Sequence, residues 1–433
     1  MKIALLNYGC AKNLVDIELM AGILAEKGHK ITLDEENADI LLINTCSFIR
    51  DAETESVRSI VSNLGKNKKI IVTGCLPQKY KKELQAALPE VYAFVGISEI
   101  NEIADIVELI EKDEKIFRVN ETPVYSYPEN AVRQQITVGA SSYLKIAEGC
   151  NCNCGYCIIP KLRGKYVSRP IESIVHEAKS LAYKGVSEII LIAQDTTYYG
   201  KDLYGKRALP QLLKELIKID NLQKIRIMYT YPTGITNELL SVIKSSDKIF
   251  NYIDIPLQHA SKKVLKSMKR PVSDYRKLIE KIRNKIPDIA IRTTFIVGYP
   301  GETEEDFQEL KDFVSDVKFD KIGVFEYSPE KDTYSYTLKN RVNAKIKRAR
   351  KKELMELQKG ISEKINEKLI GKEIECIVEY ITEKGAVIGR TYKDAPEVDG
   401  LIYLNSKDEV LPGDIVTARV TKADTYDLWG DIV

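Results

Sequence analysis

The first part of the chain alternates short apolar runs with stretches of helical periodicity. Apolar runs that predict buried strands occupy residues 2–7, 39–44, 69–73 and 91–95. Apolar residues at helical spacing follow at residues 14–27, 52–64, 78–88 and 101–110. Strands that alternate with helices in this way form parallel sheets covered on both faces. The pattern therefore predicts an α/β domain.

A polar stretch from about residue 119 to 135, with Pro123 and Pro128, predicts a linker. The alternation then resumes on a larger scale. Predicted strands lie at residues 143–147, 188–193, 224–229, 252–255, 290–297 and 323–327, with helices between them, for example at 171–184 and 304–317. Six such units predict a partial (β/α)6 barrel, a fold whose active sites lie at the C-terminal ends of the strands.

The C-terminal part of the chain begins with one long predicted helix, residues 344–368, whose first turns are basic. From Gly371 to Val433 the pattern changes to five short β runs broken by Gly and Asp, which predicts a small β-barrel. The predicted organisation is therefore an N-terminal parallel-sheet domain (1–118), a central partial barrel (136–365) and a C-terminal β-barrel (369–433).

Composition excludes some classes of protein. Of 433 residues, 44% are apolar, and no apolar run is long enough to cross a bilayer. The N-terminus becomes polar too early for a signal peptide. We therefore expect a cytoplasmic protein without a membrane partner. In that reducing compartment the eight cysteines are more typical of metal ligands than of disulfides, and three histidines argue against a His-rich site.

Three cysteines form a CxxxCxxC motif directly after the first predicted barrel strand: Cys150, Cys154 and Cys157. Three thiolates on one loop can bind a 4Fe–4S cubane and leave one iron open for a small molecule. The alternative is a structural zinc site with Cys152 as the fourth ligand. The position at the barrel mouth favours the iron–sulfur interpretation. We treat Cys152 as a bystander, because its CxC spacing is tight for sharing one cluster.

A second set of cysteines follows three successive predicted strands of the N-terminal domain. Cys10, Cys46 and Cys75 would all lie at the C-terminal edge of a parallel sheet, where ligands bind in open α/β folds. Three unrelated core cysteines would have no reason to occupy the same point on three strands. We therefore predict a second three-cysteine cluster, again with one open iron.

The CxxxCxxC motif, with an aromatic residue before its last cysteine and a partial barrel around it, resembles the radical S-adenosylmethionine (SAM) superfamily. The resemblance implies that SAM chelates the open iron. It also implies that cleavage of SAM yields a 5′-deoxyadenosyl radical, which removes a hydrogen atom from the substrate. A flavodoxin or ferredoxin would supply the electron.

Two three-cysteine sites in this order, followed by a TRAM-type barrel, resemble the methylthiotransferase family of radical SAM enzymes over nearly the whole chain. The stretches GCAKNLVDIE (9–18) and AQDTTYYG (193–200) are similar to the branch that methylthiolates the β-carbon of an aspartate in a small-subunit ribosomal protein. Relatives that modify tRNA more often carry Gln-Met after this first cysteine and a GQNV-like second stretch. Ile17 and the extra Cys152 depart from the pattern, but neither is a presumed ligand.

The resemblance also suggests which residues contact SAM, all near the strands of the barrel. These are Tyr156, Gln194, Asp195, Gln258, Arg292 and Gly298. The alternative for each is a structural role, because polar residues at strand ends often support the fold. No catalytic residue beyond the cluster ligands is assigned.

Three functions remain open on these residues: an aspartate methylthiotransferase, a tRNA-adenosine methylthiotransferase, and a non-enzymatic iron–sulfur protein with a TRAM interaction module. An electron carrier has no need for an open-iron motif at a barrel mouth. Residues 371–433 contain seven basic and thirteen acidic side chains, a net charge of −6. Such a barrel suits a basic ribosomal protein better than RNA phosphates, although the basic start of helix 344–368 could contact RNA. We therefore predict a protein substrate that binds the acidic barrel, and regard tRNA as the less favoured alternative.

Overall fold

The structure is a computed structural model that describes residues 1–48, 50–128, 132–137 and 139–433, which form two compact units. Unit 1 comprises residues of Met1–Val138, Ala147–Cys152 and Cys157–Arg169, and unit 2 comprises Gly139–Ile146, Asn153–Tyr156 and Pro170–Val433. The α/β class is confirmed, whereas the three predicted domain boundaries stay a prediction. Within the described residues, no helix combines the length and apolarity that a membrane span requires.

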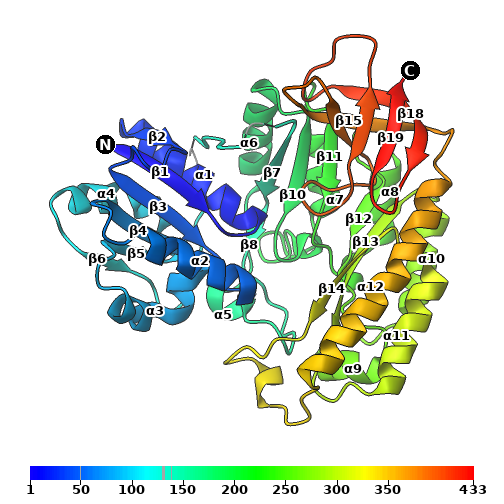
Figure 1. The fold of residues 1–433 in the computed structure, drawn as a ribbon, viewed down its shortest axis with the longest axis horizontal. Helices are drawn as coiled ribbons and strands as arrows, with labels where there is room; N and C mark the ends of the chain where they lie inside the picture. Colours follow the sequence, from blue (N-terminus) through cyan, green and yellow to red (C-terminus); the bar gives the residue numbers. More distant parts are fainter. Residues whose placement is uncertain (49, 129–131, 138) are drawn as a thin grey trace. The chain divides into compact units, whose positions relative to one another are not determined.

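Unit 1 contains a six-stranded, all-parallel sheet in the order β2-β1-β3-β4-β5-β6 (Figure 1). Its strands are β1 (Lys2–Asn7), β2 (Lys30–Thr32), β3 (Ile40–Thr45), β4 (Lys69–Gly74), β5 (Ala93–Val95) and β6 (Ile116–Arg118). Its main helices are α1 (Ala11–Glu26), α2 (Arg50–Asn63), α3 (Cys75–Ala87) and α4 (Ile103–Glu111). Ala4 and Leu6 of β1 pack with Ile60 of α2, while the alternate residues Ile3 and Leu5 are also buried. Both faces of the sheet are therefore covered, as a parallel sheet requires.

Unit 2 contains the predicted six-stranded partial barrel, with parallel sheets β7-β10-β11 and β12-β13-β14. The strands are β7 (Ser141–Lys145), β10 (Glu188–Ile192), β11 (Lys224–Ile227), β12 (Tyr252–Asp254), β13 (Ala290–Val297) and β14 (Lys321–Glu326). Helices α6 (Ile171–Tyr183), α7 (Leu209–Leu216), α8 (Asn237–Lys244), α9 (Lys262–Ser267), α10 (Tyr275–Lys285) and α11 (Glu304–Val317) lie between them. An isolated bridge between Ile225 and Ile249 joins the two sheets.

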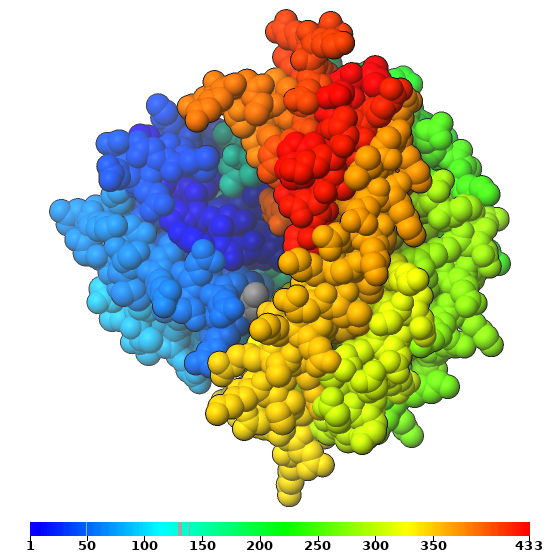
Figure 2. Space-filling model, turned by 45° about the vertical axis from the view of Figure 1, so that its right-hand side comes forward, coloured from blue at the N-terminus to red at the C-terminus, as the bar shows by residue number. Residues whose placement is uncertain are grey.

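The C-terminal region of unit 2 consists of one long helix and a closed five-stranded barrel. Helix α12 (Ala344–Glu367) packs on β14 and α11, and Figure 2 shows it in yellow and orange beside the red C-terminal strands. The barrel runs in the order β15-β16-β17-β19-β18, with β15 (Glu373–Ile381), β16 (Val387–Thr391), β17 (Ile402–Asn405), β18 (Ile415–Ala423) and β19 (Leu428–Ile432). Both predictions for this region, the long helix and the small barrel, are confirmed.

A buried polar seam joins the C-terminal barrel to the N-terminal ends of the partial-barrel strands. Glu188, the first residue of β10, accepts hydrogen bonds from Arg226 Nε at 2.6 Å and from Arg390 Nη2 at 2.5 Å. In the loop after β16, Asp399 accepts from Tyr252 Oη at 2.8 Å and pairs with Arg292 at 3.3 Å. The acidic residues of the barrel thus serve partly to neutralise bases within the same chain.

We expect Glu188→Ala to destabilise unit 2 by about 3–5 kcal/mol, because two buried guanidinium groups lose their shared carboxylate. Burial opposes ionisation of Glu188, but Arg226 and Arg390 outweigh it and lower its pKa from 4.5 to about 2. The stabilisation is therefore complete above pH 4.5 and is lost as the pH falls toward 2. Thermal melts at pH 7 and pH 3 measure both effects.

Glu373→Ala is the matched control, because the Glu373–Arg419 pair is half-exposed on the same barrel. Its removal should cost about 0–1 kcal/mol. If the Glu188 and Glu373 variants melt at the same temperature, the buried seam does not supply the stability predicted for it.

Candidate functional site

The N-terminal cysteines lie at equivalent points after three adjacent strands. Parallel pairing sets Asn7 of β1 opposite Asn44 of β3, and Asn44 opposite Thr73 of β4. Cys10 then precedes α1, Cys46 follows β3, and Cys75 opens α3. Burial raises the pKa of Cys75, and negative charge on Cys10 and Cys46 raises it further. The sheet therefore places the three cysteines at its C-terminal edge, and their role as cluster ligands stays a prediction.

Hydrogen bonds between Asn13 and Asn44 hold the loops that carry these cysteines. Asn13 Nδ2 donates to Asn44 Oδ1 at 3.0 Å and to the carbonyl of Thr45 at 3.2 Å, and Asn44 Nδ2 donates back to the carbonyl of Asn13 at 2.7 Å. Gly74 has a φ of +95°, and a Cβ there would lie 2.4 Å from Asn44 Oδ1. Glycine is therefore needed directly before Cys75.

A buried guanidinium group lies against this edge. Arg163, the last residue of α5 (Ile159–Arg163), donates from Nη2 to Asn13 Oδ1 at 3.0 Å and to Cys75 Sγ at 3.6 Å. Burial raises the pKa of Cys75 to about 11, opposed by Arg163. At Cys10, burial opposes ionisation, but Lys12 and Arg163 outweigh it and the pKa is lowered. Arg163 thus favours the thiolate form that binds metal.

The CxxxCxxC loop has separate anchors in the two units. In unit 1, the amide of Cys150 donates to the carbonyl of Gly164 at 3.1 Å, and the amide of Cys152 donates to Cys150 Sγ at 3.4 Å. Cys152 thus supports Cys150 through its backbone, which any residue supplies. The interpretation of its side chain as a bystander stays a prediction.

In unit 2, Cys154 lies beside a second buried arginine. Arg270 Nη1 donates to Cys154 Sγ at 3.8 Å, and its guanidinium carbon lies 4.2 Å from the ring centroid of Tyr231. Burial opposes the charge on Arg270, but Tyr156 and Cys154 outweigh it, so the pKa is raised. Tyr156 itself packs against the buried cluster of Val264, Met268, Tyr299 and Tyr327.

Gly155 is fixed from both sides. Its amide donates to the carbonyl of Met268 at 2.7 Å, and its carbonyl accepts from the amide of Ser335 at 2.7 Å. A Cβ on Gly155 would lie about 3 Å from Tyr299 Oη. These contacts hold the segment that carries Cys154 and Tyr156 on the body of unit 2.

Some of the predicted SAM contacts have structural partners. Gln194 lies after β10, and Asp195 next to it caps the turn that follows, accepting from the amide of Thr197 at 2.9 Å. Burial raises the pKa of Asp195, opposed by its hydrogen bonds to Thr197. Arg292 pairs at 3.3 Å with Asp254 and with Asp399, near the N-terminal end of β13. This position favours a structural role for Arg292 over a contact at the barrel mouth, where its predicted contact with SAM would be.

Gln258 and Gly298 lie at the C-terminal side of the partial barrel. Gln258 is buried with a φ of +74°, an uncommon conformation that is often found at functional sites. Gly298 has a φ of +73°, and its amide donates to Glu302 Oε2 at 2.7 Å. A Cβ on Gly298 would overlap Lys347 of α12. Both positions are compatible with the predicted SAM contacts, which stay predictions.

His259, next to Gln258, is fully buried, and burial lowers its pKa to about 3. Its Nδ1 accepts from the amide of Ser261 at 3.0 Å. A neutral, enclosed imidazole that supports a backbone turn fits a structural role rather than acid–base chemistry.

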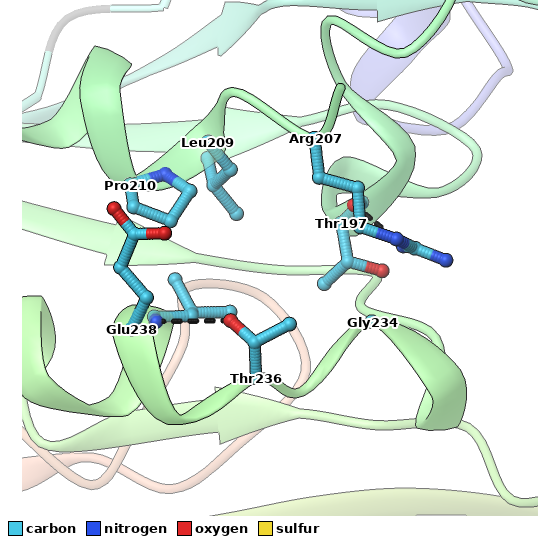
Figure 3. A pocket seen from close by; sticks show the side chains of 8 residues that line it. Thr197, Arg207, Leu209, Pro210, Gly234, Thr236 and Glu238 are labelled. Atoms are coloured by element: carbon cyan, nitrogen blue, oxygen red, sulfur yellow. Dashed lines mark hydrogen bonds between the residues drawn. The ribbon is translucent and has the colours of Figure 1, made fainter. Parts of the chain in front are cut away.

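Unit 2 also contains a pocket between α7 and α8. Residues Thr197, Arg207, Pro210, Gly234, Thr236 and Glu238 line it, as Figure 3 shows. Across the described residues, no group of three or more His, Cys, Asp or Glu side chains is arranged to hold a single metal ion. Ligands of a cubane each bind a different iron and so lie further apart than ligands of one ion.

Comparison with known proteins agrees with this arrangement. Residues 2–96 match Uncharacterized protein family UPF0004, residues 144–314 match the Radical SAM superfamily, and residues 370–433 match the TRAM domain. The chain is 47% identical to ribosomal protein uS12 methylthiotransferase RimO of Clostridioides difficile (strain 630), over 100% of this chain and 99% of the relative. The RimO of Aquifex aeolicus (strain VF5) is 46% identical over 99% of this chain and 97% of its own.

The chain belongs to the RimO family of radical SAM methylthiotransferases. Membership of the radical SAM superfamily implies SAM and a 4Fe–4S cluster as cofactors. The predicted resemblance to this family and the predicted enzyme class are confirmed.

Solved structures show the same fold at low sequence identity. The radical SAM methyltransferase TsrM from Kitasatospora setae has a TM-score of 0.57 and 13% identity, over 75% of this chain and 72% of its own. The cobalamin-dependent radical SAM enzyme OxsB has a TM-score of 0.51 and 12% identity, over 82% of this chain and 56% of its own. At this identity the likeness concerns the fold alone.

Sequence reasoning missed Arg163 and Arg270, two arginines that contact cysteine sulfur. Neither stands in a motif with cysteine. Arg163 precedes a glycine and Arg270 precedes a proline, an ordinary context for a surface base. The folded structure reveals them, because it shows a buried guanidinium group beside a thiol.

We expect Cys152→Ala to retain the radical SAM cluster and SAM cleavage, because alanine keeps the amide that donates to Cys150 Sγ. Cys154→Ala should lose both. Iron content and 5′-deoxyadenosine formation, measured anaerobically with a strong reductant, distinguish the two variants. The opposite pattern would show that the ligand set is wrong.

Proposed function

We propose that the chain adds a methylthio group to the β-carbon of an aspartate in ribosomal protein uS12, with SAM and two 4Fe–4S clusters as cofactors. The observation that carries this proposal is the pair of cysteine sites, one at the edge of the N-terminal sheet and one on the loop after β7. Relatives that share 44–47% identity over nearly the full chain are named ribosomal protein uS12 methylthiotransferase RimO.

The proposed ligands of the radical SAM cluster are Cys150, Cys154 and Cys157. Those of the second cluster are Cys10, Cys46 and Cys75. The residues present fit anionic clusters, because Arg270 donates to Cys154 and Arg163 donates to Cys75. Donors aimed at sulfur and buried positive charge are the features by which proteins stabilise such clusters.

The chemistry explains why a radical is required. The C–H bond at the β-carbon of an aspartate is too weakly acidic for a side-chain base to open a route to substitution. When bound, SAM would supply the 5′-deoxyadenosyl radical needed to remove this hydrogen atom, after cleavage by one electron from the cluster. The protein contributes position: Gly155 and Tyr156 are held by packing on unit 2, and Asn13 and Asn44 hold the N-terminal cysteine loops.

The second cluster predicts the iron content of the protein. Anaerobically reconstituted wild-type chain should hold about eight irons, four for each cubane. Replacing Cys10, Cys46 and Cys75 together with Ala should halve this number and leave SAM cleavage intact, because the other cluster keeps its ligands. Iron analysis with a SAM cleavage assay measures both, and a full iron load in the triple variant would refute the N-terminal site.

The surface of the C-terminal barrel supports a basic protein partner. Glu375, Asp394 and Asp399 neutralise lysines and an arginine of the partial barrel, whereas Asp424 and Asp431 are exposed. The exposed acidic residues are therefore the proposed contacts for a basic ribosomal protein.

The basic start of α12 gives less support to RNA binding than the sequence suggests. Arg350 is buried and pairs with Glu302 at 2.8 Å, and Lys347 Nζ donates to the carbonyl of Tyr327 at 2.7 Å. These two basic side chains have partners within unit 2. The others are exposed: Lys345, Arg348, Lys351 and Lys352.

A uS12 peptide deuterated at the aspartate β-carbon tests the substrate directly. We expect deuterium to appear in 5′-deoxyadenosine and the peptide to gain the mass of a methylthio group, both read by mass spectrometry. Deuterium that stays on the peptide, with methylthio addition to tRNA in a parallel reaction, would show that the tRNA alternative is correct.

The same assay tests the acidic surface. Asp424→Lys with Asp431→Lys should weaken peptide binding and leave substrate-free SAM cleavage unchanged. Asp427 is left intact, because it accepts a hydrogen bond from the amide of Leu401 at 2.9 Å and its loss would disturb the barrel.

The family resemblance further suggests a flavodoxin or ferredoxin as electron donor and the cytoplasm, where ribosomes are assembled, as the site of action.

A further inference from the structure

Arg163 joins the two cysteine-bearing regions within unit 1. Its Nη2 atom donates to Asn13 Oδ1 at 3.0 Å and to Cys75 Sγ at 3.6 Å, both at the N-terminal site. Its Nη1 atom donates to Glu148 Oε2 at 2.8 Å and reaches Asp16 at 3.4 Å. Glu148 ends β8 (Ala147–Glu148), two residues before Cys150. One side chain therefore contacts the second cysteine site and the entrance to the CxxxCxxC loop.

The contacts of Arg163 require the planar guanidinium group of arginine. The side chain of Arg163 is only 1% exposed, and the carboxylates of Glu148 and Asp16 are also buried. A lysine ammonium is a compact charge and could not span four acceptors in this geometry. Because the guanidinium group of Arg163 contacts Cys75 Sγ directly, its charge has a strong influence on the electrostatics at Cys75.

We infer that Arg163 is a positioning residue shared by both cysteine sites, which fixes the start of the CxxxCxxC loop against the N-terminal cysteines and places one positive charge beside the second cluster. The inference rests on the proposed second cluster. It assigns to Arg163 two measurable effects: a more positive reduction potential of that cluster, and rigidity of the segment 147–152. Neither effect requires Arg163 to contact the substrate.

The potential is measured in full-length chain whose radical SAM ligands Cys150, Cys154 and Cys157 are replaced with Ala, so that only the N-terminal cluster contributes to an EPR-monitored redox titration. Arg163→Gln should shift the midpoint to a more negative potential, because reduction adds an electron where a cation has been removed. Asp16→Asn should shift it to a more positive potential, because a compensating carboxylate is lost. A purely structural role would not produce shifts of opposite sign.

Arg133→Gln is the matched control. Arg133 is also buried in unit 1 and donates from Nε to Glu18 on α1 at 2.7 Å. It should leave the midpoint unchanged, although it removes a guanidinium from an equally buried ion pair. Arg163→Lys keeps the charge and should keep the midpoint near the wild-type value. If Arg163→Gln fails to fold, Asp16→Asn and Arg163→Lys still decide the result.

Rigidity is measured by amide hydrogen exchange in the metal-free full chain. Arg163→Lys should accelerate exchange in segment 147–152 by at least about tenfold, since lysine keeps the charge but cannot make all the buried hydrogen bonds of the guanidinium group. Arg133→Gln should not accelerate exchange in that segment.

The outcomes separate the two proposals. A background variant that holds no iron overturns the proposed second cluster, and this inference with it. If the background variant holds four irons, either of two results overturns the inference alone. One is a midpoint potential that neither Arg163→Gln nor Asp16→Asn shifts. The other is a midpoint potential that both variants shift in the same direction.

Discussion

Parallel pairing of β1, β3 and β4 is the constraint on which the N-terminal site depends. The register aligns Asn7, Asn44 and Thr73, so the chain leaves all three strands at the same edge. A slip of one residue would turn every side chain to the opposite face of the sheet and separate the cysteines. The hydrogen bonds between Asn13 and Asn44 then convert this alignment of strands into an alignment of loops.

Buried arginines are the second recurring element. Arg163, Arg226 and Arg390 are among the largest fully buried side chains, and each contacts a buried carboxylate. A buried ion pair contributes little net stability, but the loss of one partner is costly, so such pairs fix geometry. In unit 1 the geometry concerns cysteine loops. In unit 2 it concerns the attachment of the C-terminal barrel.

Much of the architecture follows from the sequence, because long apolar runs and helical periodicity depend on local pattern. Strand β13 and helix α11 have the predicted bounds, and the five C-terminal strands were all expected. Strands β2 and β6 were missed, because three residues at a sheet edge carry too little periodicity. The cysteine positions could be predicted because they follow strands directly. The partners of Arg163 and Arg292 could not, since those residues meet only after folding and their sequence neighbours resemble those of surface bases.

Strands β15 and β16 and the loop after β16 attach the C-terminal barrel to the partial barrel. Ser141, Glu188, Lys224, Tyr252, Arg292 and Lys321 lie near the starts of the six partial-barrel strands, and each contacts a residue of residues 371–433. The TRAM domain thus covers the N-terminal end of the partial barrel and also presents a surface to solvent. A chain cut after α12 would leave Arg226 and Lys321 without part of their compensation. Removal of the C-terminal barrel would therefore also weaken the partial barrel.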